Sequence, residues 1–137
     1  LAAGLAGNLT EAQLDEMQAL AERYPEPANS SEEEMEQHVA SLAFHTRLSE
    51  FSGNPLLKFI ISFMARVLRE MTIYRKLYDP PNIELWQRGR EHQINLVKAL
   101  RAGDAEASRQ IMASHMQGAE QLMKKQEAKL ARRFIGE

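Results

Sequence analysis

Residues 41–57 constrain the fold more than any other stretch, because they end one helix, turn, and begin the next. The turn Gly53-Asn54-Pro55 supplies, in order, a residue that commonly follows a helix end, an N-cap and a first-turn proline. On a helical wheel, Ser41 and His45 lie one turn apart between apolar positions. The stretch therefore predicts a helical hairpin whose first helix turns two polar side chains toward the interior.

The rest of the chain carries helix signals and no strand signal, since it has no Asn-Gly hairpin and no sustained alternation of apolar and polar residues. Residues 1–7 resemble the end of a helix that begins upstream. Further helices are predicted to begin after capping residues, and these are Thr10, Ser30 or Ser31, Asn82 and Asp104. We predict an all-α fold in one domain, residues 1–137: an antiparallel helical bundle of about six helices with a polar central cavity.

The helix after Pro55 is apolar almost all round for about three turns, a pattern typical of a central, buried helix. It is expected to end before Asp79-Pro80-Pro81. Arg66 shares a face with Phe59 and Phe63. Its side chain could reach the surface, form an internal ion pair, or provide a counter-charge for a carboxylate ligand.

The composition of the chain argues against several classes of function. A net charge of −2 argues against a grip on a phosphate backbone by this chain alone. The absence of cysteine excludes disulfides, thiolate metal sites and thiol catalysis. No apolar run reaches about 18 residues and no signal peptide is visible, so we expect no membrane association and a cytoplasmic location.

Four polar side chains are predicted to face inward from three helices, and they form the candidate site. They are Ser41, His45, Gln93 and His115, whereas His92 falls on the flank of its helix. Each could be a satisfied core residue, but together they predict the lining of a polar cavity. His45 and His115 could hold zinc or nickel, although Ser41 and Gln93 are poor ligands. No inward acidic residue would orient a catalytic histidine, which argues against nucleophilic catalysis.

Several of these residues belong to segments that resemble the FCD domain, the C-terminal ligand-binding and dimerisation domain of FadR-type regulators in the GntR transcription-factor family. The resemblance extends from the first helix to about Met123. Its motifs are specific in combination, and they are Phe44-His45, Ser52-Gly53-Asn54-Pro55, Ala99-Leu100-Arg101-Ala102-Gly103-Asp104 and Met112-Ala113-Ser114-His115.

The resemblance implies a metal site built from an Asp-x-x-Phe-His segment and two later histidines, which helps to hold a small carboxylate effector. Here the aspartate position is Ser41, and the first and last histidines correspond to His45 and His115. Gln93 takes the position of the middle histidine, while His92 takes that of the glutamate before it. Two of four ligands are therefore replaced, and we expect a transition metal to bind weakly or not at all.

We interpret the chain as the effector-binding domain of a bacterial transcriptional regulator and not as an enzyme. A small organic acid would bind through Ser41, His45, Gln93 and His115, with Arg66 as a further candidate for its carboxylate. The resemblance also implies a homodimer, and DNA contacts only through an upstream winged helix-turn-helix domain absent from this chain. The alternatives are a helical-bundle metalloenzyme using His45 and His115, and a helical interaction module without a ligand.

Overall fold

The computed structural model describes residues 1–75 and 82–135, and within these ranges the chain forms six helices and no strand. The helices are α1 (Ala2–Leu5), α2 (Glu11–Glu22), α3 (Ser31–Glu50), α4 (Pro55–Arg75), α5 (Ile83–Arg101) and α6 (Ala105–Ile135). The prediction of an all-α bundle is confirmed. The helix break predicted at Asp79-Pro80-Pro81 lies outside the described residues.

Side-chain caps explain why the helices begin where they do. In each cap a side-chain oxygen accepts a hydrogen bond from a backbone N–H two or three residues later, and so satisfies a donor that the helix start leaves unpaired. Gly53 ends the α3 segment with a φ of 65°, a conformation that glycine adopts without strain. The capping residues are those predicted from sequence, namely Thr10, Ser30, Asn54, Asn82 and Asp104.

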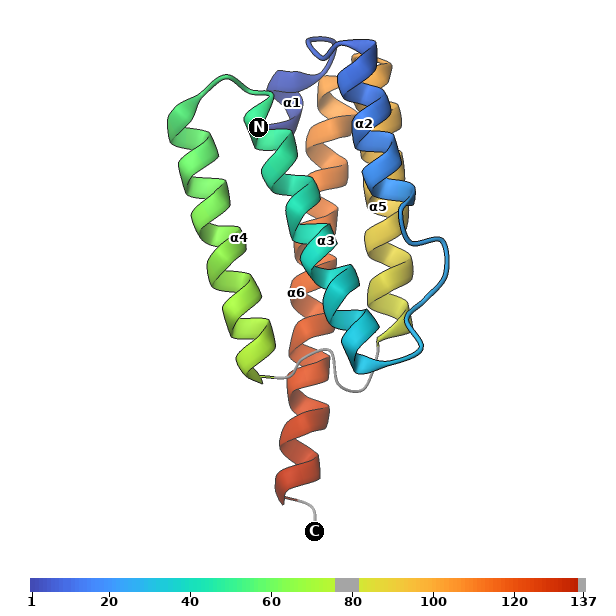
Figure 1. Cartoon of the computed structure of the whole chain (residues 1–137), viewed down its shortest axis with the longest axis vertical. Helices are drawn as coiled ribbons and strands as arrows, with labels where there is room; N and C mark the ends of the chain where they lie inside the picture. The colour runs from blue at the N-terminus through green and yellow to red at the C-terminus, as the bar shows by residue number, and fades with distance from the viewer. Residues whose placement is uncertain (76–81, 136–137) are drawn as a thin grey trace.

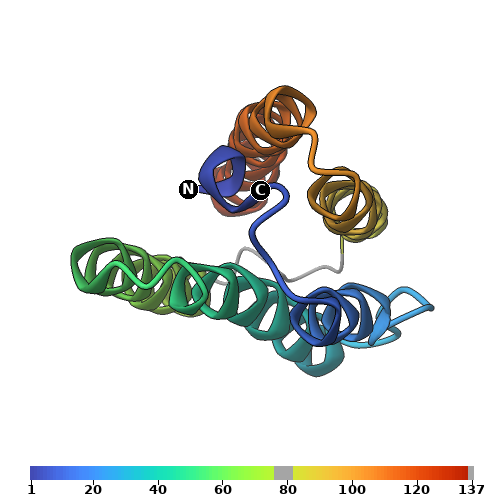
Figure 2. The ribbon, with the colours of Figure 1, turned by 90° about the horizontal axis from the view of Figure 1, so that it is seen from above.

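The helices lie in two layers (Figures 1 and 2). Seen from above, α4, α3 and α2 lie side by side in one layer, and α5, α6 and the short α1 form the other. Within the layers α3 packs against α4 and α5 against α6, while contacts between α2 and α5 join the layers along one side. The face of α3 turned toward α5 and α6 is therefore an interior surface.

One end of this interior is apolar and is called the apolar end below. Its most completely buried side chains belong to Met17, Phe44, Leu48, Leu96 and Leu100. Gly7 and Gly103, with φ of 74° and 70°, bring two turns together there, because a Cβ on Gly7 would lie only 3.6 Å from the Gly103 Cα. The Gly7 backbone N–H also donates to the Leu100 carbonyl at 3.4 Å.

The prediction that the helix after Pro55 is central and buried is wrong. α4 lies at the edge of its layer, with α3 as its main partner (Figure 2). Phe59 is 67 % exposed and Phe63 58 %. An apolar pattern indicates that a helix surface is buried away from water. It does not indicate whether the same chain or another molecule buries it. The other exposed apolar residues of α4 are Leu56, Ile60, Met64, Val67, Leu68 and Met71.

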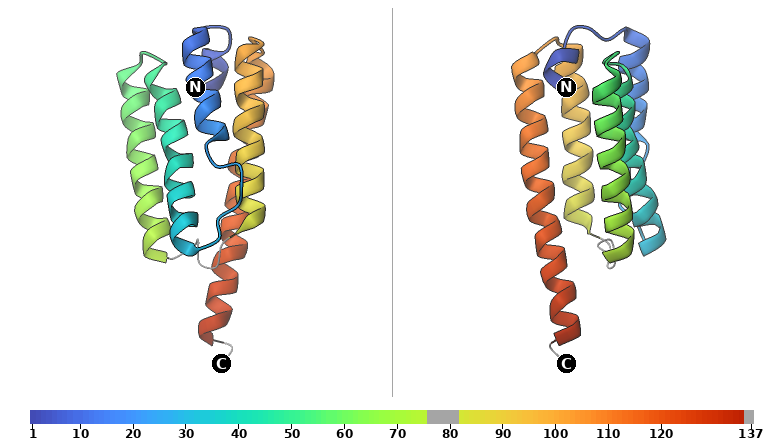
Figure 3. Two further views of the ribbon diagram at one scale, coloured as in Figure 1. Left: turned by 45° about the vertical axis from the view of Figure 1, so that its right-hand side comes forward. Right: turned by 90° about the vertical axis from the view of Figure 1, so that its left-hand side faces the viewer.

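The long helix α6 continues past the ends of the other helices, so that its C-terminal turns project from the bundle (Figures 1 and 3). α6 packs against α5 and α1. Among the described helices, none combines the length and the apolar character needed to cross a membrane.

Candidate functional site

The predicted inward face of α3 is confirmed by a hydrogen bond between the layers. The Gln93 side-chain amide, on α5, donates to the Ser41 hydroxyl, on α3, at 2.9 Å. Gln93 is only 6 % exposed, as its place near the centre of the apolar face predicted. The bond satisfies one donor of a buried amide and links α3 to α5.

His45 meets His115 across the interface between α3 and α6. Their ring centroids lie 5.5 Å apart with an angle of 27° between the planes, so the two imidazoles are stacked. The His45 ring also makes an edge contact with Phe44, with centroids 5.4 Å apart. The structure thus brings together the two histidines that the sequence analysis selected.

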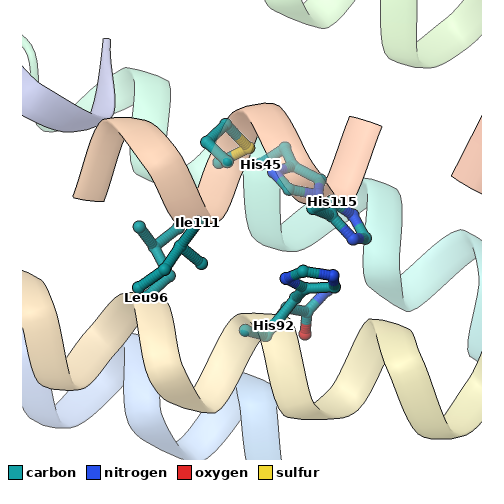
Figure 4. A pocket seen from close by; sticks show the side chains of 7 residues that line it. His45, His92, Leu96, Ile111 and His115 are labelled. Carbon is teal, nitrogen blue, oxygen red and sulfur yellow. The ribbon is translucent and has the colours of Figure 1, made fainter. Parts of the chain in front are cut away.

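His92, which was expected to lie outside the site, also belongs to it. Its ring centroid lies 4.8 Å from that of His115, and Figure 4 shows the His92 ring directed from α5 toward α6. The helical wheel placed His92 wrongly because α5 has polar partners on two different helices, α3 and α6. Gln93 faces α3 and the preceding residue, about 100° away, faces α6, so both point to polar partners.

We call Ser41, His45, His92, Gln93 and His115 the histidine cluster. Around it lie Leu96, Ile111 and Met112, of which Leu96 and Ile111 are labelled in Figure 4. The space between these side chains is too small for a water molecule. The predicted polar lining is present, but the predicted central cavity is not open. Close packing of this kind is normal for a protein interior.

Arg66 is not brought to the cluster. It lies on α4, where its side chain is exposed, and it is not among the residues around the histidines. The arginine that does lie near them is Arg88, which shares a groove with His92 and His115. The sequence could have indicated Arg88, because it lies four residues before His92 and residues i and i+4 share a helix face.

The cluster is electrically neutral at neutral pH. Burial, together with the neighbouring His115, lowers the pKa of His45 to about 4. Burial and the neighbouring His92 lower the pKa of His115 to about 4. The pKa of His92 is lowered mainly by burial and also by the positive charge of Arg88, while Glu91 opposes the shift. Neutral imidazoles can both donate and accept hydrogen bonds.

A family model of the FCD domain matches residues 1–118. The chain belongs to the FCD domain family. No curated protein and no solved structure gives a match. FCD domains are ligand-binding and dimerisation domains of GntR-type transcription regulators, and the suspected resemblance is confirmed.

The FCD resemblance implied a metal, and the donor atoms of the cluster test that expectation. Two of the four corresponding positions hold Ser41 and Gln93, which are hydrogen-bonded to each other. A hydroxyl and an amide are weak ligands beside a carboxylate and an imidazole. Among the described residues, no three His, Cys, Asp or Glu side chains are placed to hold a metal ion. The residues present therefore do not fit a metal site.

Proposed function

We propose that this FCD domain senses a small organic acid at the histidine cluster, within a bacterial GntR-family regulator of the FadR subfamily. Membership of the FCD family supports a regulatory, ligand-binding role. The observation that carries the choice of site is the hydrogen bond between Gln93 and Ser41 beside the stacked histidines. Polar groups from three helices converge there, although apolar side chains would fill the same space without needing partners.

The closed cluster suggests how binding could change the domain. Because the space between the side chains is too small for a water molecule, a ligand must displace some of them, and we propose that it separates Gln93 from Ser41 or His45 from His115. Either movement shifts α3 relative to α5 or α6. A ligand that binds the separated arrangement more tightly shifts the population toward it, and an attached DNA-binding domain would respond to that shift.

Binding is proposed to need no metal, since the cluster offers neutral hydrogen-bonding groups and lacks a full ligand set. Imidazole N–H, amide N–H and hydroxyl groups can all donate to a carboxylate. Arg66 lies outside the cluster and does not enter the proposal.

The experiment is a screen of small mono-, di- and tricarboxylates against the purified chain, by thermal shift and then calorimetry. A binding acid should raise the melting temperature, because it binds the folded state only. His115→Leu and Gln93→Leu should abolish the response. Ser114→Ala, at an exposed position one residue from His115, serves as the control and should respond like the parent.

Each alternative has its own signature in that screen. Binding that survives EDTA supports the metal-free site, whereas stoichiometric bound metal with catalytic turnover would favour the metalloenzyme. Flat thermal shifts for every acid would favour the interaction module without a ligand.

We also propose that two copies of the chain associate through the exposed apolar face of α4. The face carries eight large apolar side chains on one helix, among them Phe59 and Phe63, and exposed patches of this kind mark interaction sites. Sedimentation should give about twice the 15.6 kDa mass of one chain. Phe63→Glu should give single chains, while Ser114→Glu, on exposed α6 surface, should not. A parent chain sedimenting only as single chains would refute the dimer.

A further inference from the structure

The linker between α2 and α3, residues 23–30, is called the strap below. It runs from the end of α2 to the start of α3, along the side of the bundle where α3 faces α5 (Figure 3, left). On α5, the Trp86 indole N–H donates to the Tyr24 carbonyl at 3.3 Å. On α3, the Gln37 side-chain amide donates to the Glu26 carbonyl at 3.1 Å. The strap therefore bridges α3 and α5 about one turn before the histidine cluster.

The strap buries little of its own surface. Ala28 is its only buried residue, whereas α2, which precedes it, buries Leu14, Met17 and Ala21. Segments with few buried apolar contacts open at a lower free energy than the core elements around them. The two side-chain hydrogen bonds are therefore a large part of what holds the strap in place.

Three buried polar atoms near the strap have no hydrogen-bond partner within the part of the chain that the structure describes. They are Gln37 Oε1, His38 Nε2 and Arg90 Nε. His38 follows Gln37 on α3, and Arg90 lies four residues after Trp86, on the same face of α5. A buried polar atom without a partner destabilises the closed arrangement, and water becomes its partner when the covering segment moves away. These atoms therefore favour opening of the strap.

We propose that the strap opens locally, while the helices remain folded, and that this opening admits small molecules to the polar interior between α3 and α5. The inference rests on the proposed function and adds the entry route that a closed cluster requires, since the space inside it is too small for a water molecule. Entry then requires the movement of one linker and leaves the apolar end intact.

Single cysteines can report the opening, because the chain contains none. Ser41→Cys places a thiol in the cluster behind the strap, and Ser49→Cys places one at a position of α3 that is 0 % exposed, next to Leu48 of the apolar end. The purified chains are treated with iodoacetamide under native conditions, and alkylation is followed by mass spectrometry. Ser41→Cys should react at least about tenfold faster, because the thiol at position 49 is exposed only when the whole bundle unfolds.

Variants of the strap bonds test the mechanism. Gln37→Leu and Trp86→Phe each remove one bond, and each should speed alkylation of the Ser41→Cys chain about two- to tenfold, the usual net value of a neutral hydrogen bond. Gln37→Leu should leave the rate of the Ser49→Cys chain unchanged. Gln110→Leu is the matched control, because it removes an exposed amide bond to Glu106 within α6, at 2.8 Å, and should change neither rate.

A second measurement needs no cysteine. Trp86 is the only tryptophan of the chain, so its indole N–H gives a single NMR signal. Its exchange with solvent should be faster than that of the backbone N–H groups of Leu96 and Leu100 in the core. Gln37→Leu should accelerate the exchange of the indole and leave that of the core groups unchanged.

Three outcomes would overturn the inference: equal alkylation rates of the two cysteine chains, no acceleration by Gln37→Leu, or equal acceleration of both chains, which would mean unfolding of the whole bundle. The proposed function can fail separately. If the strap opens as described but no acid in the screen binds, the proposed function is wrong and the opening stands. If an acid binds at Gln93 and His115 with the same association rate in Gln37→Leu as in the parent, the ligand enters elsewhere and only the strap inference is refuted.

Discussion

The apolar end and the histidine cluster are adjacent parts of one interior, yet they are held together differently. On α3, Leu48 at the apolar end is completely buried, and His45 in the cluster lies one turn before it. On α5, Gln93 in the cluster lies two turns before Leu100 at the apolar end. The apolar end is stabilised by hydrophobic burial, whereas the cluster relies on a hydrogen bond and stacked rings.

The two parts of the interior therefore contribute differently to the stability of the fold and to its response to a ligand. Full burial of a large apolar side chain contributes about 1.5–3 kcal/mol, while a hydrogen bond contributes a net of about 0.5–1.5 kcal/mol. The cluster should therefore open at a smaller cost than the apolar end. A domain that is anchored at one end and held by weak polar contacts further along can respond to a ligand without unfolding.

The largest effect is expected at the apolar end. Leu100 is 1 % exposed within the hydrophobic core, and Leu100→Ala should lower the free energy of unfolding by about 2–5 kcal/mol, through lost burial and a residual cavity. Chemical denaturation measures it. A loss below about 1 kcal/mol would show that the apolar end does not anchor the bundle.

Local signals in the sequence predicted most of the fold. The cap at Asn54 depends on residues within the same turn, because its side-chain oxygen accepts from the Leu56 backbone N–H at 3.0 Å. Helix order and antiparallel turns follow from such signals. The position of α4 does not, because the same apolar pattern suits a helix buried within the chain and one covered by another molecule.

The candidate site was predictable where a polar residue lies within the apolar face of its helix. Ser41 and His45 lie within such a face of α3, and Gln93 lies near the centre of the apolar face of α5, where it donates to Ser41. His92 was misplaced because α6 approaches α5 on the side of that residue, and no single-helix wheel contains that information. The expected cavity is not open, because the side chains of Leu96 on α5 and of Ile111 and Met112 on α6 occupy the space beside the histidines.

The next effect concerns pH and distinguishes the cluster from the apolar end, which does not titrate. The pKa values of His45 and His115 lie at about 4 in the folded chain, against 6.5 for ordinary histidine. Between those values the unfolded chain binds more protons, so the free energy of unfolding should fall as pH decreases from 6.5 toward 4. The slope is at most about 1.4 kcal/mol per pH unit for each histidine.

Denaturation at several pH values from 6.5 to 5 measures the total slope, to which His38 contributes as well because burial lowers its pKa. His115→Gln should reduce it by the share of one histidine. His92→Gln should change it less, because only part of that residue's environment is buried and Glu91 counteracts the lowering of its pKa. A slope unchanged by His115→Gln would show that the His115 imidazole is already solvated in the folded chain.

The smallest effect is expected from the bond that joins α3 to α5. Ser41→Ala leaves the buried Gln93 amide without its acceptor and should cost about 1–3 kcal/mol, near the lower limit if water replaces the hydroxyl. Gln93→Leu removes the donor and leaves the Ser41 hydroxyl to find another partner. The double variant should lose less stability than the sum of the two single losses, with a coupling energy of about 1 kcal/mol, because replacing both partners by apolar groups leaves nothing unsatisfied.

Denaturation of the parent, the two single variants and the double variant measures this coupling energy. Ser114→Ala, at an exposed site, is the control and should stay within about 0.5 kcal/mol of the parent. Additive losses would mean that the bond does not hold the two layers together. The cluster would then differ from the apolar end only in its titration.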